Sequence, residues 1–178
     1  ILNEILKTGK VGIFQMRFKN YSLNKKIILG KKIKKICKKN NVKFLINDDP
    51  FLTKKINADG CHLGQHDINI TTARKLLKKK IIGITCHNSI KLAKIAQNFG
   101  ADYVAFGSFY RTKTKKVKYY SNYRTLKLAK KKLDILTVAI GGIKNSNYKI
   151  LLNNGANMVA MSSFIWSTKN PITKINLF

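Results

Sequence analysis

The chain has 178 residues, of which 44% are hydrophobic, so it can bury one good core and is expected to fold as a single domain over residues 1–178. This composition excludes a disordered chain, and the absence of an apolar run of about 18 residues excludes a membrane-spanning helix. The formal net charge of +29 raises the question of a nucleic-acid partner.

The positive charge comes almost entirely from lysine, because only four of the 36 basic residues are arginine. The chain is also rich in Ile and Asn, which, like Lys, are encoded by A- and T-rich codons. Lysines fall on the presumed outer faces of helices, as in Lys31-Lys32 and Lys34-Lys35. We therefore interpret the charge as a solvated surface that steers small phosphorylated anions, and we expect no specific nucleic-acid partner.

The N-terminus lacks the basic-then-apolar pattern of a signal peptide, and the cysteines are odd in number and isolated. Cys37, Cys61 and Cys86 fit a reducing compartment better than a disulfide framework or a Cys-x-x-Cys metal site. We therefore expect a cytoplasmic protein without a membrane partner.

Apolar runs typical of strands alternate with amphipathic stretches along the chain, which is the signature of parallel βαβ units. Gly100 and Gly155 stand where two of the helices should end. The predicted strands are Val11–Gln15, Val42–Ile46, Gly60–Leu63, Ile81–Ile84, Tyr103–Phe106, Ile135–Ile140 and Met158–Met161. The predicted helices cover residues 1–8 and about 23–39, 70–79, 89–99, 122–132 and 145–154, with a shorter link near 51–57.

Seven strands preceded by a helix predict an α/β protein, a (β/α)8 TIM barrel that lacks its first β-strand. The sequence leaves open whether that strand is naturally lost, lies beyond a chain boundary or comes from a partner. The structural alternative is an open doubly wound sheet. That fold would need a glycine-rich phosphate loop after its first strand, and Gln15-Met16-Arg17 offers none.

Two carboxylates stand at the ends of neighbouring predicted strands. Asp48 follows the run Phe44–Ile46, and Asp67 follows the strand that ends at Leu63. Magnesium takes one or two protein carboxylates and completes its octahedron with water and substrate phosphate. We therefore predict a Mg²⁺ site at Asp48 and Asp67. Ligation by His62 and His66 is not expected, because no third ligand stands at a suitable spacing.

Two further strand ends carry groups that suit a phosphate. Strand alternation places Gln15, Arg17 and Lys19 on one face, presenting an amide and two cations, although a solvated strand end has the same pattern. Thr85 follows the strand that ends at Ile84 and adds a small polar group.

The segment after Phe106 is the longest plausible loop and the richest in anion-binding groups. The hydroxyls of Thr112 and Thr114, with the ammonium of Lys115, can hold a phosphate or stabilise a departing diphosphate. A basic surface loop without a ligand is the alternative reading of the same residues.

The last two predicted strands end in Gly141-Gly142 and in Ser162-Ser163. Paired glycines let backbone N–H groups approach an anion, and the loops after the last two barrel strands form the usual phosphate site. A tight turn without a ligand remains an alternative for the glycines.

Seven segments, taken in order, closely resemble the thiamine phosphate synthase family. They are QMRFK, FLINDD, ADGCHLGQHD, IIGITCH, GADYVAFGSFYRTKTK, VAIGGI and GANMVAMSSFI, and the resemblance covers Val11 to Ile165. The resemblance implies a (β/α)8 enzyme that joins a hydroxymethylpyrimidine diphosphate to a thiazole phosphate. The products would be thiamine monophosphate and diphosphate.

The resemblance also implies a role for each candidate residue. Mg²⁺ would bind Asp48 and Asp67, and Lys115 and Arg17 would be catalytic by stabilising the leaving diphosphate. The pyrimidine diphosphate would be held by Gln15, Arg17, Lys19, Asn47, Thr85 and Lys115, and the thiazole phosphate by Thr112, Thr114, Gly142, Ser162 and Ser163. The family more usually has Ser at Thr85 and often an aliphatic residue at Ser162; a hydroxyl is kept in the first case, and a backbone contact would tolerate the second.

Two other functions compete with the synthase. A thiazole tautomerase shares the barrel but would not need the diphosphate-binding residues, and a degenerate barrel would bind a phosphorylated ligand or nucleic acid without catalysis. The expected partners are the two small-molecule substrates, and a homo-oligomer is left open.

Overall fold

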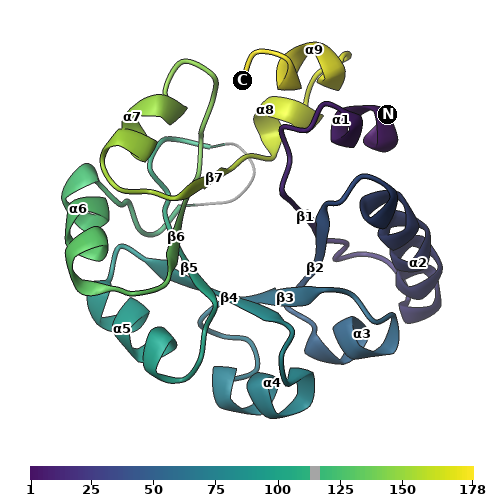
Figure 1. The fold of residues 1–178 in the computed structure, drawn as a ribbon, viewed down its shortest axis with the longest axis horizontal. Coiled ribbons are helices and arrows are strands. Elements are labelled where there is room, and N and C mark those ends of the chain that lie inside the picture. Colours follow the sequence, from purple (N-terminus) through teal and green to yellow (C-terminus); the bar gives the residue numbers. More distant parts are fainter. Residues whose placement is uncertain (113–116) are drawn as a thin grey trace. The chain divides into compact units, whose positions relative to one another are not determined.

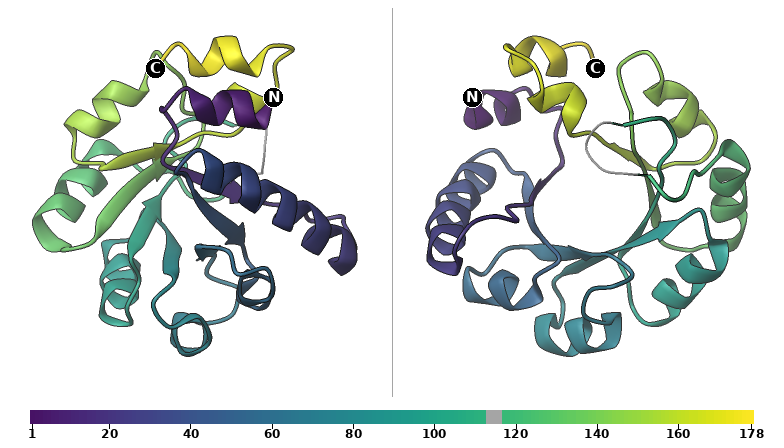
Figure 2. Two further views of the ribbon diagram at one scale, coloured as in Figure 1. Left: turned by 45° about the vertical axis from the view of Figure 1, so that its right-hand side comes forward. Right: turned by 180° about the vertical axis from the view of Figure 1, so that it is seen from behind.

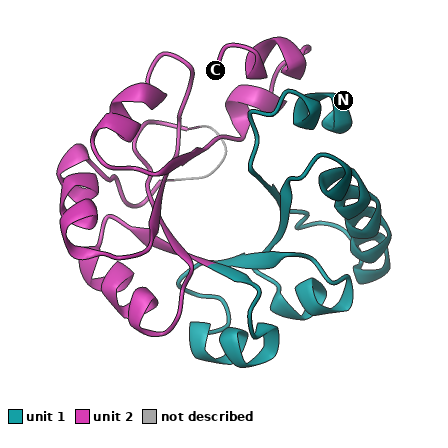
Figure 3. Ribbon diagram, viewed as in Figure 1, with its two compact units in different colours: residues 1–82 teal, residues 83–178 magenta. Residues whose placement is uncertain are grey.

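The computed structural model describes residues 1–112 and 117–178. It divides into two compact units, residues 1–82 and residues 83–178, which are described separately (Figure 3). In each unit parallel strands alternate with helices, which confirms the predicted parallel α/β class. The expectation of a single domain stays a prediction.

Unit 1 contains a parallel sheet in the order β1-β2-β3, with helices along it (Figure 1). Phe14 pairs with Phe44, and Ile46 pairs with Cys61. Its elements are α1 (Leu2–Lys7), β1 (Ile13–Met16), α2 (Leu23–Lys39), β2 (Lys43–Asn47), α3 (Pro50–Lys55), β3 (Gly60–Leu63) and α4 (Ile70–Leu77).

The two faces of this sheet differ in chemistry. Met16 is buried and lies against Gly30 of α2, so its face of β1 packs on the helices. Because successive strand residues point to opposite faces, Gln15 points away from α2. Asn47 and His62 are paired on β2 and β3, and Asn47 stands two residues after the partner of Gln15. Polar side chains of three strands therefore share the face that the helices leave uncovered.

Unit 2 contains a parallel sheet in the order β4-β5-β6-β7, with helices along one face (Figures 1 and 2). Ile84 pairs with Val104, and Ala139 pairs with Val159. Its elements are β4 (Ile81–His87, entered from unit 1), α5 (Ile90–Asn98), β5 (Tyr103–Phe106), α6 (Tyr123–Lys132), β6 (Leu136–Ile140), α7 (Tyr148–Asn153), β7 (Met158–Ala160), α8 (Ser163–Trp166) and α9 (Pro171–Ile175).

Short polar side chains fix where the helices begin. A residue at the N-cap accepts a hydrogen bond from the backbone N–H three residues later, which satisfies one of the free donors of the first turn. Pro50 also stands in the first turn of α3, where its missing N–H costs nothing. The capping residues are Ser22, Asp49, Asn69, Ser89, Asn122 and Asn170.

Left-handed residues fix where four helices end, as predicted for Gly100 and Gly155. After α5, Gly100 (φ +86°) donates to the carbonyl of Gln97, and Ala101 donates to that of Ala96. This pair of bonds is the Schellman motif, which needs a positive φ at its central residue. Gly155 closes α7 in the same way, and asparagines take the place of glycine after α2 and α3.

The structure differs from the sequence prediction at several strand ends and at the C-terminus. The predicted end of a strand at Ile84 was wrong, because β4 continues to His87 through a register shift between Thr85 and His87. The strand β1 begins at Ile13 and ends at Met16, two residues and one residue later than predicted. The short helices α8 and α9 were not predicted, since neither is long enough to show a clear helical period.

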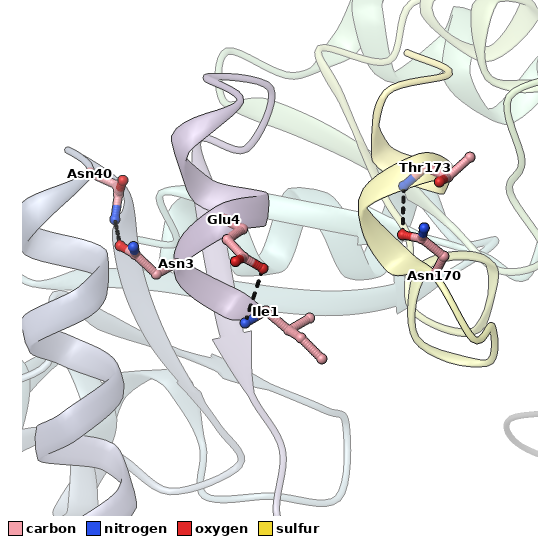
Figure 4. A network of polar contacts seen from close by, with 6 residues as sticks. All are labelled: Ile1, Asn3, Glu4, Asn40, Asn170 and Thr173. Carbon is pink, nitrogen blue, oxygen red and sulfur yellow. Dashed lines mark hydrogen bonds and ion pairs between the residues drawn. The ribbon is translucent and has the colours of Figure 1, made fainter.

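Figure 4 shows polar contacts at the ends of α1, α2 and α9. Asn40 Nδ2 donates to Asn3 Oδ1 over 3.0 Å, which ties the end of α2 to α1. The terminal amine of Ile1 lies 3.4 Å from Glu4 Oε2, an exposed pair that adds little stability. Within unit 2, Asn170 caps α9 by accepting from the N–H of Thr173.

The lysines of α2 lie as the sequence suggested. Lys31, Lys32 and Lys35 are exposed, whereas Ile33 and Ile36 beside them are half-buried. This arrangement agrees with a solvated charged face. No helix in the described ranges is long and apolar enough to cross a membrane.

We expect Gly60→Ala to destabilise the protein by about 3 kcal/mol, because added volume in a packed core forces the backbone apart. A Cβ at Gly60 would lie 2.1 Å from the carbonyl oxygen of Ile81, which belongs to rigid backbone. The matched control is Gly12→Ala, since nothing lies within 4 Å of a Cβ at that position. Denaturant unfolding should show a change within about 0.5 kcal/mol for the control; equal effects for both variants would contradict this packing.

Candidate active site

Asp48 and Asp67 come together in unit 1, where their carboxyl groups share a hydrogen bond. Asp48 directly follows β2 and has a left-handed backbone (φ +65°), and its N–H donates to the carbonyl of His62 over 2.8 Å. The carboxylate of Asp67 accepts a 2.7 Å hydrogen bond from the N–H of Gly64. The backbone at the ends of β2 and β3 therefore holds the two carboxyl groups against each other.

The environment raises the pKa of Asp48. Burial is the largest cause, followed by the hydrogen bond to Asp67 and the negative charge of Asp67, while Arg17 and Lys19 act in the opposite direction. Two carboxylates in contact repel each other, which costs free energy unless a proton or a cation lies between them. The pair and the two nearby cations therefore suit a hard divalent cation with bound phosphate.

This donor set fits magnesium better than a metal that is enclosed by protein ligands. Among the described residues, no group of three or more His, Cys, Asp or Glu side chains could hold a metal ion. Magnesium commonly takes only one or two carboxylates and keeps positions for water and phosphate oxygens. Asp48 and Asp67 therefore match magnesium in the number and type of their ligand atoms, and their role as magnesium ligands stays a prediction.

The amide and cation residues of β1 gather beside this pair. Gln15 Nε2 donates to Asn47 Oδ1, which links the end of β1 to that of β2. Gln15, Arg17 and Lys19 are exposed, whereas Met16 is buried and Phe18 is half-buried. Both cations act electrostatically on Asp48. Unit 1 thus brings together its six predicted site residues, Gln15, Arg17, Lys19, Asn47, Asp48 and Asp67.

His62 and Gly64 support this arrangement and were not predicted to do so. His62 is only 8% exposed, and burial lowers the pKa of its imidazole to about 4, against a smaller opposing effect of Asp67. It is therefore neutral near pH 7. A Cβ at Gly64 would lie 3.1 Å from Asp67 Oδ2. The glycine in the segment HLGQHD was the available signal that backbone approaches a carboxylate here.

In unit 2 the paired glycines after β6 make room for the chain itself. Gly141 (φ +102°) accepts from the N–H of Tyr110 over 3.0 Å, and a Cβ at Gly142 (φ +65°) would lie 2.5 Å from the carbonyl oxygen of Arg111. The glycines thus allow the segment after β5 to pack against the end of β6. Whether they also bind an anion stays a prediction.

The other predicted residues of unit 2 lie at or near strand ends. Thr85 lies on β4, and Gly142 and Ser162 follow the paired strands β6 and β7. Ser162 is the N-cap of α8 but makes no capping side-chain bond, and Ser163 begins that helix. Thr112 is half-buried in the segment after β5. Thr114 and Lys115 lie outside the described residues.

Comparison with known proteins gives the family of the chain. The family model described as thiamine monophosphate synthase matches residues 1–165. A thiamine-phosphate synthase of Pelagibacter ubique is 61% identical over 165 residues, which cover 93% of this chain and 80% of that protein. This chain belongs to the thiamine monophosphate synthase family. A thiamine-phosphate synthase of Nitrosococcus oceani is 36% identical and covers 91% of this chain and 75% of its own length.

One solved structure agrees with this family, and another shares the fold. A thiamine phosphate pyrophosphorylase from Pyrococcus furiosus matches with a TM-score of 0.90 and 26% identity, covering 99% of this chain and 84% of that one. A 3-hexulose-6-phosphate synthase matches with a TM-score of 0.68 at 16% identity, covering 99% of this chain and 90% of that one. The second likeness shows a shared fold only, which is expected of a scaffold that carries many reactions.

Proposed function

We propose that this protein is a thiamine-phosphate synthase, which joins 4-amino-2-methyl-5-(diphosphooxymethyl)pyrimidine to a thiazole phosphate and releases diphosphate. The observation that carries the proposal is the hydrogen-bonded pair of Asp48 and Asp67 with Arg17 and Lys19 nearby. Membership of the thiamine monophosphate synthase family supports it.

Asp48 and Asp67 would hold Mg²⁺, which when bound supplies positive charge to the oxygens of the diphosphate. Arg17 and Lys19 would add charge at the same group, Arg17 through its planar fork and Lys19 as a point charge. Negative charge grows on the diphosphate as its bond to the pyrimidine methylene carbon breaks. Charges already in place at that position stabilise the transition state more than the bound substrate.

Gln15 and Asn47 would hold the pyrimidine diphosphate in place, because their hydrogen bond leaves a fixed set of amide groups beside the carboxylates. The thiazole nitrogen then attacks the pyrimidine carbon, so the reaction needs no protein nucleophile. Alignment of the two substrates and exclusion of water would be the main tasks of the protein. Residues at strand ends suit this alignment, because sites on rigid elements hold a substrate more precisely than sites on surface loops.

The thiazole phosphate would bind the loop residues of unit 2, namely Thr112, Thr114, Gly142, Ser162 and Ser163. In support, the ends of β6 and β7 are neighbours, with Ile140 paired to Ala160. Thr85 and Lys115 would contact the pyrimidine diphosphate. Thr85 stands where the family usually has serine, and it keeps the hydroxyl.

The full fold we propose is the (β/α)8 barrel of the family, supported by the strand-helix alternation within each unit. We also propose a cytoplasmic location. Cys37, Cys61 and Cys86 are free and buried, as in a reducing compartment, and burial is the main cause that raises the pKa of the Cys61 and Cys86 thiols to about 12.

One assay separates the synthase from its two alternatives. The full chain is mixed with Mg²⁺ and the thiazole phosphate in ²H₂O, with and without the pyrimidine diphosphate. We expect thiamine monophosphate only when both substrates are present. Exchange of substrate protons without coupling would indicate a thiazole tautomerase, and binding of either substrate without any reaction would indicate a degenerate barrel.

We expect Lys115→Ala to slow bond cleavage by about a hundredfold or more, because a charge at the leaving group acts mainly in the transition state. Its effect on thiazole phosphate binding should be smaller. Rapid-quench single-turnover kinetics, with thiazole phosphate varied, measure the two quantities separately. The reverse pattern, with weak thiazole phosphate binding and a normal cleavage rate, would reassign Lys115.

A further inference from the structure

We propose that His87 and Tyr119 are positioning residues, which hold residues 107–112, the outgoing path after β5, in the conformation that binds the thiazole phosphate. The proposal rests on the function proposed above. Its observation is the packing of the His87 ring on the Tyr119 ring, with 4.5 Å between the ring centroids and 34° between the planes.

A β-bulge in β4 aims His87 at this segment. Thr85 pairs with Ala105, and His87 pairs with Phe106, so β4 has one extra residue, Cys86, at this point. Bulges are common beside active sites, where they redirect a side chain. The backbone of His87 also has a positive φ of 53°, a conformation that costs energy outside glycine and needs support from its surroundings. The carbonyl of His87 supplies part of that support by accepting from the N–H of Gly107 over 2.8 Å.

Tyr119 belongs to residues 117–122, the return path that leads into α6, and backbone hydrogen bonds link this path to residues 107–112. The N–H of Ser108 donates to the carbonyl of Tyr119 over 3.0 Å, and the N–H of Ser121 donates to the carbonyl of Ser108 over 2.9 Å. Asn88 Nδ2, next to His87, donates to the carbonyl of Tyr120 over 3.1 Å. The end of β4 therefore contacts two consecutive residues of the return path, Tyr119 and Tyr120.

The outgoing path continues from Ser108 toward Thr112 and rests on the end of β6. Ser108 Oγ donates to the carbonyl of Tyr110 over 2.7 Å, and the N–H of Phe109 donates to the carbonyl of Ile140 over 3.1 Å. A shift of the return path moves Ser108 and with it the path to Thr112. Since Tyr119 is 40% exposed, its ring contributes little to the core, and the ring contact is better explained by positioning than by stability.

Two pairs of variants test this inference in the full chain with Mg²⁺ and both substrates. His87→Asn keeps a residue that tolerates the left-handed backbone but removes the ring. Tyr119→Leu removes the partner ring, whereas Tyr119→Phe retains it. The matched control is Tyr120→Leu, which makes the same change at a neighbouring side chain that is 51% exposed.

We expect His87→Asn and Tyr119→Leu each to raise KM for the thiazole phosphate by roughly 10- to 100-fold, as for displaced substrate-positioning groups. The thermal midpoint should change little, because a purely structural role would lower it. The double variant should be no worse than either single variant, because coupled residues are not additive. Tyr119→Phe should behave like the wild type, and so should Tyr120→Leu.

Normal kinetics of His87→Asn and Tyr119→Leu, in a preparation whose wild type makes thiamine monophosphate, would overturn the inference and leave the proposed function intact. Additive effects of the two variants would also overturn it, because they would mean independent roles. A wild type that makes no product would instead count against the proposed function.

Discussion

Asp48→Asn and Asp67→Asn are each expected to reduce magnesium-dependent turnover by about a hundredfold or more, with the fold retained. Either change removes one of the two anionic oxygen ligands that we propose for magnesium, and an amide is a weaker ligand for a hard cation. Asparagine also tolerates the positive φ of Asp48, so the backbone should not move. Initial rates over a magnesium titration, with circular dichroism as a check on folding, measure the effect.

The matched control is Asp49→Asn, which removes a neighbouring charge. Asp49 caps α3 by accepting from the N–H of Leu52 over 2.8 Å, and asparagine is an equally good cap. This variant should keep the activity of the wild type. If Asp48→Asn, Asp67→Asn and Asp49→Asn all keep wild-type rates, the magnesium assignment is wrong.

The same carboxylate pair should cost stability when magnesium is removed. The folded state raises the pKa of Asp48, first by burial and then by its contact with Asp67. The folded state therefore favours the protonated form, and the associated stability is lost as pH rises through that raised pKa. In chelator, Asp48→Asn should be more stable than the wild type near pH 7, and the gain should shrink at acidic pH. A destabilised variant under these conditions would contradict the claim that the contact between Asp48 and Asp67 costs stability.

Gly142→Ala is expected to weaken the use of thiazole phosphate and to destabilise the protein by about 2 to 4 kcal/mol, from a left-handed backbone and crowding together. A Cβ at Gly142 would lie 2.5 Å from the carbonyl oxygen of Arg111 and 2.7 Å from Tyr110 Cβ. The segment leading to Thr112 must therefore move. Steady-state kinetics should show a higher KM for the thiazole phosphate.

Gly155→Ala separates backbone strain from displacement of this segment. Gly155 also has a positive φ, of 112°, but its nearest atoms to an added Cβ lie 3.1 Å away in Leu126 and Lys130. We expect it to lose stability while keeping a normal KM for the thiazole phosphate. Equal rises in KM for both variants would show that lower stability, rather than the position of the segment, limits substrate binding.

Much of the fold followed from local patterns in the sequence. Helix α2 was predicted at its observed bounds from its apolar spacing, and the structure adds Ser22 as its N-cap. Strands β3 and β5 also matched, because each is a short buried run between turn residues. The meeting of Asp48 and Asp67 followed from parallel strands, whose carboxyl ends share one edge.

The remainder depended on contacts that no local pattern shows. The bulge at Cys86 arises from pairing between β4 and β5. The prediction from sequence therefore ended that strand too early. The glycines after β6 suggested a close approach, but the structure was needed to show that Arg111 and Tyr110 make it. The ring contact between His87 and Tyr119 likewise joins residues that are far apart in the chain.

The most direct test of the proposed function measures both products of one reaction. The full chain is incubated with Mg²⁺, the pyrimidine diphosphate and the thiazole phosphate, and thiamine monophosphate and diphosphate are quantified over time. We predict equal amounts of the two products and none of either in chelator. Release of diphosphate without thiamine monophosphate, or no reaction by a folded protein where the Pelagibacter ubique relative forms both, would contradict the account.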